Sequence, residues 1–195
     1  MKQIAAMFLF LLFLGVCKGQ TKTVDYSTTI KEQAGIMGHL LLKKDFNSFC
    51  RYTYPSIIDM MGGKQKMVEI MEKGSIAMQS EGTTFVDVTF GDPSKIIAVG
   101  NELQFTVPQT IEMKVPNGRL TTQSTLIAIS INKGKNWYFV DTSGKDISSM
   151  KKVLPNLSGD LKIPKMTQPI FYPDKKRKPN MGCHFNLLVN FMQNL

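Results

Sequence analysis

The stretch 102–141 most constrains the fold of this chain, because it has the pattern of three β-strands joined by two tight turns. In the first of these strands nearly every odd position is apolar and nearly every even position is polar. A period of two is typical of a strand with one buried face. Asn117-Gly118 is the dipeptide best suited to a type I′ hairpin turn, and a second turn is expected at 133–135. The predicted strands are 103–115, 120–131 and 137–141.

The pairing of the first two strands leaves two alternatives open. Across an Asn117-Gly118 turn, Ile127, Ile129 and Ile131 face away from the apolar side of the first strand. A β-bulge near Pro108 would bring both apolar sets to one side and would curve the sheet strongly, since proline cannot donate a ladder hydrogen bond. The alternative is a sheet covered on both faces, with the isoleucines under the C-terminal segment. We favour the bulge.

The third strand carries two large aromatic side chains. A Lys133-Gly134 turn places Trp137 and Phe139 on the face opposite the isoleucines. Soluble proteins seldom expose a contiguous apolar patch of that size, so these side chains need a cover. We expect the cover to be the C-terminal arm, 147–163. The alternative is a second subunit, which would make the protein a homodimer through its sheet.

Helical patterns precede the strands. Apolar residues recur at helical spacing in 26–44, a short second segment follows Asp45, and a third helix is predicted for 64–80. Further strands are expected at 86–90 and 95–99, and a short helix follows Asp146. Helices first and strands second predict an α+β fold, with N-terminal helices packed on a mostly antiparallel, strongly curved, cone-like sheet and a C-terminal arm.

The first residues have the organisation of a secretory signal peptide. Lys2 supplies a positive charge, 4–14 is apolar, and small residues lead to Gly19. The apolar run is shorter than the roughly 20 residues that span a bilayer. We expect cleavage after Gly19 and a secreted or periplasmic protein with no transmembrane segment. Cys17 lies in the outline of a bacterial lipobox, but Val16 stands where a small residue belongs, so we expect no lipidation.

The rest of the chain divides into a single α+β domain, 20–163, and a Pro-rich basic tail of low order, 164–195. The formal net charge is +9, and part of it lies in the basic run 175–178. No aromatic residues interleave with that run, so we expect no nucleic-acid partner. Cys50 and Cys183 could pair in an oxidising compartment, but we favour unpaired thiols.

Three N-terminal helices followed by a long antiparallel sheet resemble the nuclear transport factor 2-like, or cystatin-like, cone superfamily. The resemblance covers 26–141 and rests on element order and on three short motifs: Lys44-Asp45-Phe46, Tyr54-Pro55 through Gly62-Gly63, and Asn136-Trp137-Tyr138-Phe139-Val140. It implies a pocket between the helices and a concave sheet and frequent dimers. It also implies functions ranging from isomerases and cyclases to binding modules.

No catalytic residue is assigned from the sequence. Enzymes of the isomerase type place carboxylates inside an apolar cone, but Gln109 is the only polar residue on the apolar face of the first long strand. His39 has no evident partner, and His184 beside Cys183 is too small a set for a metal site. We therefore expect no metal and no cofactor. The candidate pocket residues are Met37, Tyr52, Tyr54, Gln109 and Tyr138.

The sequence favours a non-catalytic binding module for a small apolar ligand or a partner protein. The alternatives are a cone-fold enzyme of the isomerase or cyclase type and a structural protein of the cell envelope. A carboxylate deep in a cavity would favour the enzyme, whereas a solid core would favour the structural protein.

Overall fold

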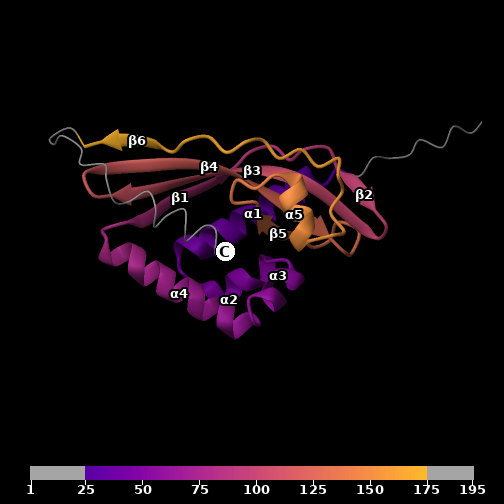
Figure 1. Cartoon of the computed structure of the whole chain (residues 1–195), viewed down its shortest axis with the longest axis horizontal. Helices are drawn as coiled ribbons and strands as arrows, with labels where there is room; N and C mark the ends of the chain where they lie inside the picture. Colours follow the sequence, from indigo (N-terminus) through magenta and orange to yellow (C-terminus); the bar gives the residue numbers. More distant parts are fainter. Residues whose placement is uncertain (1–24, 175–195) are drawn as a thin grey trace, which may run out of the picture.

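The computed structural model describes residues 25–174 of the 195-residue chain. Its N-terminal helices pack against one face of a six-stranded antiparallel sheet, which confirms the predicted α+β class (Figure 1). The helices are α1 (Ser27–Leu42), α2 (Phe46–Phe49), η1 (Cys50–Tyr52), α3 (Pro55–Met60), α4 (Lys64–Ser80) and α5 (Ile147–Val153). The strands are β1 (Thr84–Phe90), β2 (Ile97–Val99), β3 (Glu102–Val115), β4 (Gly118–Ser130), β5 (Tyr138–Asp141) and β6 (Ile170–Pro173).

The two longest strands, β3 and β4, form the centre of the sheet. Both β1 and β2 pair with β3, while β5 and β6 pair with successive parts of β4. In Figure 1, helices α2, α3 and α4 lie below the long strands and β6 lies above them. The sheet is not closed, and its strong curvature stays a prediction.

The hairpin between β3 and β4 turns one residue earlier than predicted, which shifts the strand pairing by two residues. Val115 pairs with Gly118, so Pro116 and Asn117 occupy the centre of the turn. Asn117 has a φ of 69°, and proline followed by a residue at positive φ fits a type II turn. The predicted Asn117-Gly118 turn is therefore wrong. Both registers, however, place the same residues on each face, because they differ by an even number.

The predicted bulge near Pro108 is also wrong. Pairing of β3 with β4 runs without interruption from Leu103 opposite Ser130 to the turn. The carbonyl oxygen of Pro108 accepts a hydrogen bond from the N–H of Gly91 at 2.9 Å, just past the end of β1. The two polar groups of a strand residue face the same neighbour, so the missing N–H of Pro108 lies on the β1 side and costs no bond to β4.

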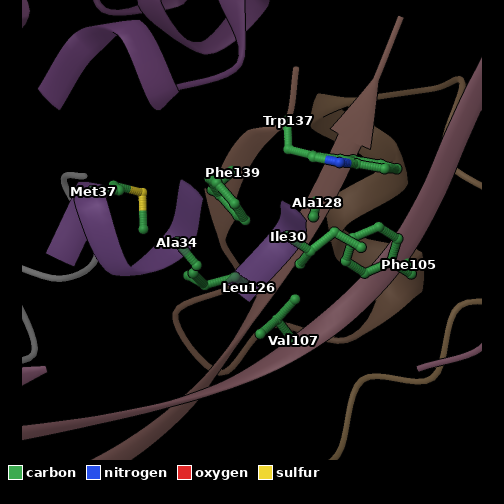
Figure 2. Packing of buried hydrophobic residues seen from close by; sticks show 9 residues of the cluster. All are labelled: Ile30, Ala34, Met37, Phe105, Val107, Leu126, Ala128, Trp137 and Phe139. Atoms are coloured by element: carbon green, nitrogen blue, oxygen red, sulfur yellow. The ribbon is translucent and has the colours of Figure 1, made fainter. Parts of the chain in front are cut away.

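The helix-facing side of the sheet holds the largest buried side chains. Trp137 is 1 % exposed and packs edge to face on Phe105, with ring centroids 4.7 Å apart. Figure 2 shows this pair and Phe139 beside α1, which contributes Ile30, Ala34 and Met37 to the same cluster. The cluster also contains Val107, Leu126 and Ala128. The predicted cover of Trp137 and Phe139 is therefore wrong: α1 covers them, rather than the arm or a second subunit.

The opposite face is covered by the C-terminal arm, as in the alternative of a sheet covered on both faces. Ile127 and Ile129 are buried on this face together with Val140. The arm contributes four buried side chains: Met150, Leu154, Leu157 and Leu161. Ile131 lies beyond this cluster and is 49 % exposed. The sheet thus separates two cores, one under the helices and one under the arm.

The C-terminal segment departs from the expected tail of low order. Its part Ile170–Pro173 forms β6, which pairs with β4 from Gly118 to Thr121. A Cβ atom on Gly118 would lie 2.3 Å from the carbonyl oxygen of Tyr172, so glycine allows the close approach of β6. The predicted signal peptide, the basic run 175–178 and Cys183 lie outside the described residues.

Candidate functional site

A small cavity lies between the helices and the sheet. Its volume is about 60 Å³, and it is partly open to solvent. Three of its lining residues are polar, namely Thr53, Gln109 and Asp141. The apolar lining comes from the helices and strands around it: Met37, Leu41, Phe49, Ile57, Met67, Phe85, Val88, Ile111, Leu126, Phe139 and Val140. The cavity is therefore an apolar space with a small polar end.

Gly38 allows α1 to approach β1 beside this cavity. A Cβ atom at this position would lie 3.0 Å from Cε2 of Phe90 and 3.2 Å from Cγ1 of Val88. Its neighbours on the same face of α1, Met37 and Leu41, are buried and line the cavity. The close contact of helix and strand thus limits the cavity on this side.

The polar end of the cavity is a hydrogen-bonded group of three side chains. Oδ2 of Asp141 accepts bonds from Oγ of Ser124 at 3.2 Å and from Nε2 of Gln109 at 3.4 Å. The same Nε2 lies 3.3 Å from Oγ of Ser124. The N–H of Ser143 donates to Oδ1 of Asp141 at 2.6 Å. Strand pairing positions all three, because Gln109 stands opposite Ser124 and Asp141 stands opposite Leu126.

Burial changes the acidity of this group. Removal from water raises the pKa of the Asp141 carboxyl above its usual value of 3.8. The bonds from Ser143 and Ser124 and the positive charge of Lys145 oppose that rise. A carboxyl group with a raised pKa inside an apolar cavity can accept a hydrogen bond from a ligand, or accept a proton.

The predicted pocket residues divide between two places. Met37 and Gln109 line the cavity, and Tyr52 packs at the margin of the helix-side core. Tyr54 and Tyr138 instead contact each other edge to face, with ring centroids 6.2 Å apart. The five residues therefore do not form one pocket.

Tyr54 has a separate polar contact. Its hydroxyl donates to Oε1 of Glu102 at 2.9 Å. Burial, followed by this bond to a carboxylate, raises the pKa of Tyr54 to about 12. The phenol therefore stays protonated and holds the segment before α3 against the start of β3.

Sequence reasoning missed Asp141 because of the expected bulge. Without a bulge, odd positions of β3, even positions of β4 and odd positions of β5 share one face, which places Gln109, Ser124 and Asp141 together. The alternation of Trp137, Phe139 and Asp141 was visible in the sequence. The sequence analysis did not predict that the helices cover the face that carries these three residues.

Other candidate chemistry is sparse in the part of the chain that the structure describes. Residues 25–174 contain no group of three or more histidine, cysteine or acidic side chains placed to hold a metal ion. His39 is exposed on α1, and Cys50 is buried at 3 % exposure. Among these residues, none of the helices has the length and apolar character needed to cross a bilayer.

Comparison of the chain with protein-family models and with curated proteins finds no match.

Proposed function

We propose that the protein is a binding module that holds a small, mainly apolar ligand bearing one hydrogen-bond donor. The observation that carries this proposal is the apolar cavity that ends at the Asp141 carboxylate. Ligand sites typically combine an apolar lining with a few fixed polar groups, and here Gln109 and Ser124 hold the carboxylate in place. With about 60 Å³ enclosed, the cavity takes the polar end of a ligand, and the rest lies in the open mouth.

A pair of probes of equal size tests this proposal. Phenol and toluene differ in one hydroxyl group, and their binding to the mature protein can be compared by titration with NMR detection. We expect phenol to bind about tenfold more tightly, because a hydrogen bond to a buried charged group contributes about 1.5 kcal/mol or more. The Asp141→Asn variant should lose most of this preference.

Two further variants control for the location of binding. Ile111→Phe fills the cavity and should abolish binding of both probes, since Ile111 lines it and is 4 % exposed. Ile131→Phe enlarges an exposed side chain on the other face and should leave binding unchanged. Equal binding of phenol and toluene, or binding that survives Ile111→Phe, would contradict the proposal.

A second candidate function is an enzyme that moves a proton, and one observation favours it. Asp141 is a carboxyl group of raised pKa enclosed with apolar side chains, and such a group is a suitable general base. Exchange of the α-protons of cyclohexanone in D₂O measures this activity directly. Acceleration by the protein that disappears in Asp141→Asn would support an enzyme. Exchange at the rate of buffer without protein would leave binding as the supported function.

We further propose that the chain is a secreted or periplasmic member of the cone superfamily. The order of helices and strands and the apolar run 4–14 support this proposal. N-terminal sequencing of the exported protein should begin at Gln20. A diacylglyceryl group on Cys17 would contradict the expected cleavage after Gly19.

A further inference from the structure

A second, larger hollow lies on the face of the sheet opposite the helices. It is a groove of about 410 Å³ between the middle of β3 and β4 and the segment 162–167. This volume falls in the range of about 300–1,000 Å³ that small-molecule sites occupy. The arm does not fill this groove, because its buried leucines end at Leu161. The groove is therefore separate from the cavity that ends at Asp141, although Gln109 lines both.

The chemistry of the groove differs from that of the neighbouring core. On this face the buried isoleucines of β4 give way to Thr125 and Gln123, and β3 contributes Thr106 and Thr110. Hydroxyl and amide groups therefore form its floor. Pro108 and Met166 add apolar surface beside them. A floor of this kind suits a ligand with several hydroxyl groups and some carbon surface.

One hydroxyl group in this lining has no partner. Thr142 is 1 % exposed and lines the groove, and its Oγ1 atom forms no hydrogen bond with any described residue. A buried polar atom is costly without a partner, so an unpaired hydroxyl at the wall of a groove points to a partner that the protein does not itself supply.

The charge at the rim is positive. Lys162 and Lys165 both line the groove and are exposed, and neither forms an ion pair with a described residue. The one acidic residue of the lining, Asp92, is already paired with Lys31 of α1. Two ammonium groups beside a floor of hydroxyls favour a ligand that carries a negative charge as well as hydroxyl groups.

We propose that this groove binds a sugar acid, a hydroxylated ring that bears a carboxylate. The ring lies on the floor between Thr106 and Thr125, and its carboxylate faces Lys162 and Lys165. The hydroxyl of Thr106 donates to the carbonyl oxygen of Lys162 at 3.2 Å, so it accepts from a ring hydroxyl, whereas that of Thr125 bonds to the ring directly. The site shares Gln109 and Ser124 with the polar end of the helix-side cavity, but its threonines and lysines lie outside that cavity, and the proposal does not rest on the function proposed there.

Titration calorimetry of the mature protein with D-glucuronate, D-glucose and inorganic phosphate tests the proposal. We expect glucuronate to bind about tenfold more tightly than glucose, because it adds a charge-assisted bond to the lysines, and more tightly than phosphate, which lacks the ring. The Lys162→Met/Lys165→Met double variant should bind glucuronate no better than glucose. Both side chains are exposed, so the variant should fold. The matched control Lys151→Met removes an exposed charge from α5 and should change nothing.

Three results would overturn the proposal: no glucuronate binding, binding of phosphate as tight as that of glucuronate, or an equal loss in Lys151→Met. The Ile111→Phe variant, which fills the other cavity, should leave glucuronate binding unchanged. Failure of either site can therefore be told apart from failure of the other.

Discussion

The carboxyl group of Asp141 occupies a position that lowers the stability of the fold at neutral pH. Its pKa is raised in the folded state, mainly by burial, so the folded protein holds the ionised form less favourably than the unfolded chain does. Leu126, its partner across the strands, shows that an apolar side chain is accommodated in the same layer. A buried acid that lowers the stability of the fold is typical of functional sites, where activity requires groups that stability alone would not favour.

The Asp141→Asn variant should therefore be more stable than the wild type at pH 7. The asparagine oxygen can still accept from the N–H of Ser143, and no charge is buried. The difference in unfolding free energy should shrink as the pH falls through the raised pKa towards 3.8, because the wild-type carboxyl then becomes protonated in the fold. Urea unfolding of both proteins across this pH range measures the difference. A variant that is less stable at pH 7 would contradict this account.

Asn117 carries the backbone strain of the central hairpin. Its φ of 69° suits asparagine or glycine and is unfavourable for a β-branched side chain. Asn117→Val should lower the free energy of unfolding by about 1–2 kcal/mol, and the control Asn117→Gly should leave it nearly unchanged. Thermal unfolding of the two variants compares them. Equal melting temperatures would show that the turn does not have this conformation.

At the scale of elements, β6 is held to β4 by a contact that only glycine permits. Gly118 does not have a positive φ, and the need for glycine comes from Tyr172 and Phe171, whose atoms lie 2.3 Å and 2.8 Å from the position of a Cβ atom. A glycine at this position could serve a turn or close packing, and the observed register shows that Gly118 lies in the strand after the turn. The attachment of β6 therefore depends on a single missing methyl group.

Gly118→Ala should displace β6 while β3 and β4 stay paired. The added Cβ meets backbone, which cannot move aside without breaking the strand pairing, so we expect a cost of about 1–3 kcal/mol. Hydrogen exchange should show lost protection in Ile170–Pro173 and preserved protection at the centre of the sheet. The control is Gly159→Ala, where a Cβ atom meets nothing within 4 Å. Unchanged protection of β6 in Gly118→Ala would contradict the close approach.

At the scale of the whole molecule, one sheet joins two cores, and α3 touches both sides, because its Ile57 lines the helix-side cavity and packs against the arm core. Trp137, the single tryptophan of the chain, belongs to the helix side, and Leu161 belongs to the arm side. Neighbouring residues of β4, Ala128 and Ile129, point into the two cores alternately. A substitution that loosens the packing on one face should therefore also destabilise the other face.

Leu161→Ala tests this coupling. Leu161 is 2 % exposed, and its truncation should cost about 2–5 kcal/mol. If the two cores unfold together, Trp137 fluorescence and far-UV circular dichroism should report the same lowered midpoint in urea. Val153→Ala, at a side chain that is 42 % exposed, should have little effect. A Trp137 transition that does not shift in Leu161→Ala would show that the helix side folds independently of the arm.

The α+β class, the helix 26–44 and the long strands followed from local patterns, because hydrophobic periodicity reports which face of an element is buried. Ile30, Ala34, Met37 and Leu41 define the buried face of α1 as expected. The Lys133-Gly134 turn correctly placed Phe139 on the face opposite Ile127 and Ile129, since Phe139 pairs with Ala128. These features depend on neighbours in the chain, so hydrophobic periodicity was enough to predict them.

Which layer covers which face was decided only by the tertiary structure. Alternation divides the residues of β3, β4 and β5 into two sets but does not say which set meets the helices. The proline at position 108 suggested a bulge, yet its missing donor faces the end of β1, a position that depends on where a separate strand stops. The absence of a bulge places Trp137 under α1, brings Asp141 into the cavity beside Gln109, and leaves the threonine floor of the groove on the opposite face.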